Sequence, residues 1–165
     1  MDRQEQIENL LDHYEHPRHR HTSEGADVVM PGGNPGCGDV VTIYLSIADD
    51  EASVSEVAFE GEGCTISQAA ASILMEMAHD EHWTLGAIDE IDYTTMIDIL
   101  GKEAVQMRPR CATLALGTLK AAVKKYRRDK MRRDAGLDTV EEEGGEGGDD
   151  FGIVTGSAAL QQPNE

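Results

Sequence analysis

Three cysteines, Cys37, Cys64 and Cys111, carry the most reactive side chains in this chain of 165 residues. They are odd in number and lie far apart in the sequence, so we expect reduced thiols rather than a disulfide framework. Cys64 and Cys111 each stand at the predicted start of a helix, where unpaired N–H groups and the helix dipole lower the pKa of a thiol. We therefore expect both to be partly thiolate near neutral pH, and thiolates bind soft metals and attack sulfur.

Asp39 follows Cys37 by two residues, in a segment rich in glycine and proline that predicts a loop over 31–39. From there its carboxylate can turn toward the same point as the three thiolates. Three thiolates and one carboxylate suffice for zinc, and they can also hold two edges of a [2Fe-2S] cluster, with the oxygen as the more exchangeable ligand. The alternative is that the cysteines are small buried hydrophobic residues. No Cys-x-x-Cys pair is present to decide between a metal site and a role in the core.

The hydrophobic pattern predicts the elements that separate these residues. A helical stripe predicts a helix over 3–15, which ends before Pro17. A short strand over 26–30 follows, and then a hairpin whose strands run over 41–47 and 55–60. The apolar positions that define the first helix are spaced by three and four residues: Ile7, Leu10, Leu11 and Tyr14.

The second half of the chain is predicted to be helical. A stripe between Ile66 and Met77 contains alanines, which let a helix lie close to a sheet. Shorter helical pieces are expected over 84–101, and a long helix begins near Pro109. Its apolar face carries Leu116, Leu119, Val123 and Tyr126, and its outer face carries Lys120, Lys124, Arg127 and Arg128. The fold class is therefore α+β, a small antiparallel sheet with helices packed on one face.

Charge is distributed unevenly along the chain, whose formal net charge is −18. Residues 1–107 hold 22 acidic and 4 basic residues, 108–133 hold 1 and 10, and 134–165 hold 9 and none. We assign 1–134 to one folded domain. We predict that 135–165 form a disordered acidic tail, because glycine and acidic residues bury too little apolar surface to offset the entropy of ordering. So acidic a composition fits either a salt-rich cytosol or a tail that only adds solubility.

The same charge excludes a broad affinity for nucleic acids, since the field of the molecule repels polyanions. No apolar run approaches the roughly 18 residues that a membrane span needs. The start of the chain, Met1 to Glu5, also lacks the basic and then apolar pattern of a signal segment. We therefore expect a cytoplasmic protein with no nucleic-acid or membrane partner.

Four segments occur in order around these residues: Leu11 to Arg18, Asn34 to Asp39, Phe59 to Ser67 and Arg108 to Leu114. Through them the chain resembles the IscU/NifU-type scaffold family of iron-sulfur cluster assembly, and its SufU branch most closely, over about residues 4–128. The resemblance implies that Cys37, Asp39, Cys64 and Cys111 form the site. It also implies a pyridoxal-phosphate cysteine desulfurase of the SufS/IscS type as partner, and apo iron-sulfur proteins or further Suf components as recipients.

Two features separate the chain from scaffold-type members of that family. Those members carry a histidine just before the last cysteine, where this chain has Arg110. They also carry a Pro-Pro-Val-Lys stretch that binds a dedicated Hsp70-type chaperone, where this chain has Gln106 to Pro109. Arg108 and Arg110 are similar to the basic residues of the SufU branch, whereas the 46 residues between Cys64 and Cys111 match the scaffold spacing.

The resemblance implies one of two functions. A scaffold would build a transient [2Fe-2S] cluster on the three thiolates and Asp39 and pass it to apo-proteins. A zinc-dependent sulfurtransferase would hold Zn²⁺ until the desulfurase loads persulfide sulfur, with Cys37 on its glycine-rich loop as the acceptor and Cys111 as the alternative. Arg108 and Arg110 would then hold Asp39 or an acidic group of the desulfurase. A third interpretation is a zinc-stabilised interaction module with no sulfur traffic.

Overall fold

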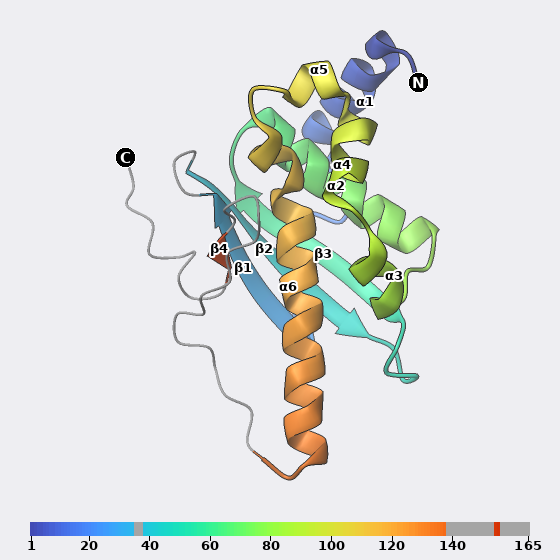
Figure 1. The fold of residues 1–165 in the computed structure, drawn as a ribbon, viewed down its shortest axis with the longest axis vertical. Helices are drawn as coiled ribbons and strands as arrows, with labels where there is room; N and C mark the ends of the chain where they lie inside the picture. Colours follow the sequence, from blue (N-terminus) through green and yellow to red (C-terminus); the bar gives the residue numbers. More distant parts are fainter. Residues whose placement is uncertain (35–37, 138–153, 156–165) are drawn as a thin grey trace.

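The computed structural model describes residues 1–34, 38–137 and 154–155. Its centre is an antiparallel sheet in the order β3-β2-β1-β4, with helices lying against one face (Figure 1). Strand β2 (Asp39–Ile47) pairs with both β1 (Val28–Asn34) and β3 (Val54–Glu62), and β4 (Val154–Thr155) adds two residues beside β1. This arrangement confirms the predicted α+β class.

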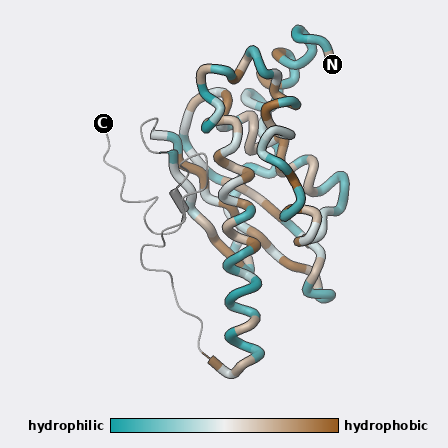
Figure 2. Tube along the Cα trace, in the orientation of Figure 1, coloured by the Kyte–Doolittle hydropathy of each residue, from teal (hydrophilic) through white to brown (hydrophobic). Residues whose placement is uncertain are grey.

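The predicted hairpin is confirmed as β2 and β3. Alternate residues of these strands point into the core, with Ile43 opposite Phe59 and Leu45 opposite Val57. Each of these four side chains is buried in the apolar core. The strands of the sheet carry brown, hydrophobic stretches along the trace (Figure 2). The period of two in the sequence therefore identified the buried face of the sheet.

Strand β1 is longer than the sequence predicted, because it continues from Pro31 to Asn34, where we expected a loop. The long helix α6 (Pro109–Asp134) packs against β1, and Gly32 permits this close approach. A Cβ atom on Gly32 would lie 1.9 Å from Oγ1 of Thr118. Pairing with β2 extends as far as Asn34 opposite Asp39, so the sheet overrides the turn-forming tendency of this segment.

The predicted stripe on helix α1 (Arg3–Glu15) is partly wrong. Leu10 is buried as expected, but Leu11 and Tyr14 are 44% and 45% exposed. The second buried residue is His13, three positions after Leu10. Helix α1 packs mainly against helix α2 (Thr65–Asp80), so it has a narrow contact face that residues three apart can fill.

The remaining helices follow the predicted order. Helix α2 is buried on almost every side because it lies among α1, α6 and β3. Helices α3 (Leu85–Glu90) and α4 (Tyr93–Leu100) fill the predicted helical stretch, and α5 (Lys102–Val105) follows before α6. The apolar face predicted for α6 is confirmed, since Leu116, Leu119, Val123 and Tyr126 are all buried. Within the described part of the chain, no helix combines the length and apolarity needed to cross a membrane.

Helix α6 ends in a Schellman motif. Gly136 adopts a φ of 73°, its N–H donates to the carbonyl of Arg133 (3.0 Å), and the N–H of Leu137 donates to the carbonyl of Arg132 (2.7 Å). The predicted disordered tail lies outside the described residues, apart from 135–137 and the two residues of β4. Those two residues pair with Gly32 and Gly33 of β1.

We predict that Gly32→Ala lowers the free energy of unfolding by about 1–3 kcal/mol, because the added methyl group overlaps the buried Thr118 side chain. Urea denaturation measures the loss. Adding Thr118→Ala removes the overlapping atoms, so the double variant should be more stable than the sum of the single effects. Gly86→Ala is the matched control, because its Cβ would meet no atom closer than 3.9 Å. Equal stabilities for Gly32→Ala and Gly86→Ala would contradict the close packing of β1 on α6.

Candidate metal centre

Asp39, Cys64 and Cys111 come from three elements that meet at one end of the sheet. Asp39 is the first residue of β2, Cys64 is the N-cap of α2 just after β3, and Cys111 lies in the first turn of α6. Because β2 and β3 are antiparallel neighbours, the start of β2 lies beside the end of β3. The packing of α6 against β1 and β2 brings its first turn to the same place.

The Asp39 carboxylate joins the two cysteines. Its Oδ2 lies 3.0 Å from Sγ of Cys111 and 3.7 Å from Sγ of Cys64, and its Oδ1 accepts the backbone N–H of Cys64 at 3.0 Å. One ligand atom from each residue lies within 4.8 Å of the others. A tetrahedral zinc ion with bonds of about 2.0–2.3 Å needs ligand atoms roughly 3.3–3.8 Å apart, so small side-chain shifts suffice to share one ion.

Burial limits access to this group. Asp39 and Cys111 are 3% and 0% exposed, whereas Cys64 is half-buried. In the part of the chain that the structure describes, these three residues form the one group of His, Cys, Asp or Glu side chains close enough to share a metal ion. The structure therefore brings together three of the four predicted ligands. Cys37 lies outside the described residues, and its part in the site stays a prediction.

Gly63 makes room for the carboxylate. A Cβ atom on Gly63 would lie 2.5 Å from both Oδ1 of Asp39 and Oγ of Ser67. The Ser67 hydroxyl donates to the carbonyl of Cys64 (3.0 Å), and its oxygen lies 3.8 Å from Sγ of Cys64. Ser67 was not among the residues predicted for the site. Its position three residues after the N-cap was the available signal, since side chains there lie over the first turn of a helix.

The prediction of a lowered thiol pKa is wrong for Cys111. Burial raises the pKa of this thiol well above its ordinary value, and the hydrogen bond to Asp39 and the negative charge of that carboxylate raise it further. The start of the helix does not compensate, because a fully buried thiolate loses its hydration. Without metal, the Cys111 thiol therefore donates to Asp39, and a bound cation would have to displace that proton.

Comparison with known proteins assigns the chain to a family. Residues 5–133 match the family described as the NifU-like N terminal domain. The chain belongs to this family. An iron-sulfur cluster assembly scaffold protein IscU from Thermotoga maritima is 34% identical, over 73% of this chain and 94% of that protein. The zinc-dependent sulfurtransferase SufU of Bacillus subtilis is 30% identical, over 70% of this chain and 87% of that protein.

The fold of this NifU-like domain also matches a solved structure. A nitrogen-fixing NifU-like protein (N-terminal) from Brucella abortus superposes with a TM-score of 0.61 over 73% of this chain and 92% of that one, at 18% identity. At that identity the match shows the fold alone. The family predicted from four sequence segments is thus confirmed by comparison along most of the domain.

The two arginines near Cys111 lie on the surface of the NifU-like domain. Arg108 is the N-cap of α6, Arg110 lies in its first turn, and both are exposed. The hydrogen bonds described for Asp39 join it to Cys64 and Cys111. An interaction of either arginine with an acidic group of a partner protein remains a prediction, and their exposure leaves them accessible for it.

The first of the four segments, Leu11 to Arg18, has a structural role in this domain. His13 is buried, and its Nδ1 lies 2.8 Å from Oγ of Ser72, which also accepts the backbone N–H of Arg18 (2.8 Å). Burial and the charge of Arg18 lower the pKa of His13. The Arg18 side chain reaches Glu76 (3.2 Å), so this segment fastens α1 to α2. It takes no part in the metal centre.

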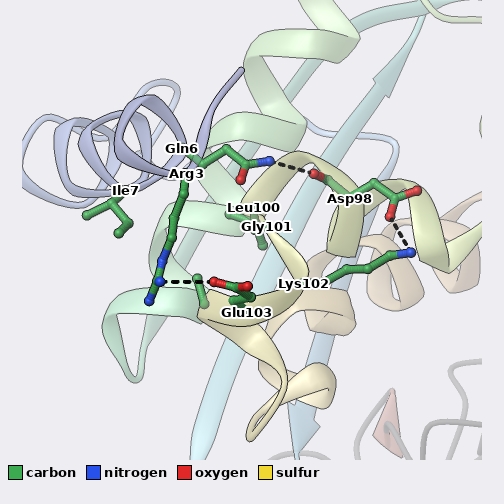
Figure 3. Close-up of a pocket in the computed structure, with 9 residues that line it drawn as sticks. Arg3, Gln6, Ile7, Asp98, Leu100, Gly101, Lys102 and Glu103 are labelled. Carbon is green, nitrogen blue, oxygen red and sulfur yellow. Dashed lines mark hydrogen bonds and ion pairs between the residues drawn. The ribbon is translucent and has the colours of Figure 1, made fainter.

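A separate surface pocket of about 480 Å³ lies between α1 and the α4–α5 segment (Figure 3). Two exposed ion pairs occupy its rim, Arg3 with Glu103 and Lys102 with Asp98. Gln6 donates to the backbone carbonyl of Asp98 at 3.1 Å. These charged groups are directed at one another, and the pocket contains neither a thiol nor a histidine. The polar contacts around this pocket hold helix α1 and the α4–α5 segment together, and its lining offers no reactive side chain.

The metal-free domain should lose stability as pH rises above the ordinary thiol pKa of about 8.5. Cys111 keeps its proton in the folded protein, whereas the unfolded chain releases it, so the stabilisation is present below that pKa and is lost above it. The free energy of unfolding of chelator-treated protein, measured by urea denaturation, should fall by about 1 kcal/mol between about pH 7.5 and pH 9.5. This fall is in addition to any fall that Cys111→Ala shows over the same range. The same pH slope in both proteins would contradict a buried neutral thiol.

Proposed function

We propose that this NifU-like domain is an iron-sulfur cluster assembly protein of the IscU/SufU type. It receives persulfide sulfur from a pyridoxal-phosphate cysteine desulfurase of the SufS/IscS type and passes it toward apo iron-sulfur proteins or further Suf components. The observation that carries this proposal is the convergence of Asp39, Cys64 and Cys111 within 4.8 Å at one end of the sheet. The similarity to an iron-sulfur cluster assembly scaffold protein of Thermotoga maritima and to a zinc-dependent sulfurtransferase of Bacillus subtilis supports a role in cluster assembly and sulfur transfer.

The donor atoms of this group fit a soft divalent metal. Two sulfurs and a carboxylate oxygen are in place, and Cys37, two residues before Asp39 in the sequence, is the proposed fourth ligand. Zinc, when bound, would keep the thiolates deprotonated and hold the ends of β2, α2 and α6 together. The same residues would hold the edges of a [2Fe-2S] cluster as cargo in a scaffold.

Sulfur transfer with zinc as the resident metal is the function that we favour over cluster building. The position next to Cys111 holds Arg110, and a guanidinium can neither ligate a metal nor accept a proton. Its exposure at the start of α6 fits contact with an acidic group on the desulfurase. The Bacillus subtilis relative named a zinc-dependent sulfurtransferase supports this choice, whereas the IscU-named relatives support the scaffold.

In the proposed transfer, a thiolate of this domain attacks the terminal sulfur of the desulfurase persulfide. A new S–S bond forms on this domain, the S–S bond of the donor breaks, and the donor cysteine leaves as a thiolate, so no external oxidant or reductant is needed. Cys111 has no exposed surface, so it is a poor acceptor in this conformation. We therefore propose Cys37, in its glycine-rich segment, as the acceptor, and Asp39, Cys64 and Cys111 would remain as the metal ligands.

We predict that Cys37→Ser abolishes persulfide loading from a desulfurase, because the proposed acceptor thiol is removed. Cys111→Ser should lose metal but keep part of the loading at Cys37, because the acceptor thiol is still present. Mass spectrometry of the loaded protein locates the added sulfur, and metal analysis of protein purified without oxygen gives its zinc and iron content.

The outcomes separate the candidate functions. Stoichiometric zinc, no visible colour and persulfide on Cys37 support sulfur transfer. Persulfide mainly on Cys111, with iron, sulfide and a brown colour, supports the scaffold instead. Stoichiometric zinc with no loading in any protein would leave a zinc-stabilised interaction module.

A further inference from the structure

Asn34 is a buried polar residue beside the metal centre that the proposed function does not use. It is the last residue of β1, is 0% exposed, and lies opposite Asp39 in the register of β1 and β2. Its Nδ2 lies 3.9 Å from Sγ of Cys111, on a sulfur that Asp39 also contacts at 3.0 Å. The amide and the carboxylate therefore approach the same sulfur from two neighbouring strands.

The side-chain amide of Asn34 is poorly satisfied in the metal-free domain. Its N–H group lies at the outer limit of a hydrogen bond to sulfur, and its Oδ1 is buried with no hydrogen-bond partner among the described residues. A buried amide without good partners is destabilising, and an apolar residue of similar volume would avoid that cost. The presence of Asn34 at this buried position is best explained by a second state of the site, in which its side-chain amide donates a hydrogen bond.

We propose that Asn34 is a positioning residue that donates an N–H···S hydrogen bond to Cys111 when this sulfur ligates a metal. A metal-bound thiolate sulfur carries more negative charge than a neutral thiol, so it is the better acceptor for an amide N–H. Hydrogen bonds to ligand atoms orient them and tune the bound metal. The proposal rests on the proposed metal site, and it adds a donor that fixes the position of the most deeply buried ligand.

Asn34→Leu tests this hydrogen bond, because leucine has a similar volume and no N–H group. The affinity for zinc, measured by competition with a chromophoric chelator, should fall by about 10- to 100-fold. The thiolate-to-cobalt charge-transfer band of the Co²⁺-loaded protein should also shift, because one sulfur loses a donor. Asn34→Ala should change both readouts in the same direction, although it leaves a cavity rather than filling the space.

Thr118→Val is the matched control. Thr118 is equally buried on α6 and packs against Gly32 of β1, but its hydroxyl donates to the carbonyl of Leu114 and not to a sulfur. It should bind zinc like the wild type, with an unchanged cobalt spectrum. Thermal melting of each metal-free variant shows whether it is folded, and affinities are compared per folded protein.

Two results would overturn the proposal. If folded Asn34→Leu and Asn34→Ala bind zinc with wild-type affinity and give the wild-type cobalt spectrum, Asn34 has only a packing role, although the metal site itself stands. If the wild-type protein binds neither zinc nor cobalt, the proposed metal site is wrong, and the proposed role of Asn34 is wrong with it.

Discussion

The arrangement of the site depends on one buried carboxylate. Asp39 accepts the backbone N–H of Cys64 through one oxygen and contacts the sulfurs of Cys64 and Cys111 through the other. An ionised group with 3% exposure is costly unless its oxygens are hydrogen-bonded or bind a cation. The N-terminal ends of α2 and α6 supply those partners. The Asp39 carboxylate thus ties the starts of α2 and α6 to the end of the sheet. Because the same carboxylate can be stabilised by a cation, it also suits this site to a metal ion.

Two glycines allow the elements around the site to pack closely. Gly32 lets α6 approach β1, and Gly63 leaves space for the Asp39 carboxylate beside Ser67. Burial at this site favours the neutral Cys111 thiol in the metal-free domain. In the proposed function, a bound metal would take the place of that proton.

Most of the fold could be predicted from local patterns. The period of two located β2 and β3, and the apolar spacing located α2 and α6, because both patterns follow from which residues are buried. The stripe on α1 misplaced Leu11 and Tyr14, since sequence spacing does not reveal how narrow the contact with α2 is. The segment Pro31 to Asn34 was expected to be a loop because it is rich in glycine and proline. The close approach of Gly32 to Thr118, which is distant in sequence, cannot be read from that pattern.

The convergence of Asp39, Cys64 and Cys111 could be predicted from residue types and family resemblance. The burial of Asn34, the contacts of Ser67 and the raised pKa of Cys111 needed the three-dimensional structure.

The central claim is that these residues share one metal ion with Cys37. X-ray absorption at the zinc edge of protein purified without oxygen tests it most directly, because it counts the ligand atoms around the metal. We expect one zinc per chain with three sulfurs at about 2.3 Å and one oxygen at about 2.0 Å, whereas Cys111→Ser should lose most of its zinc and show two sulfurs around any zinc that remains. A first shell of nitrogen and oxygen alone, or three sulfurs retained in Cys111→Ser, would contradict the account.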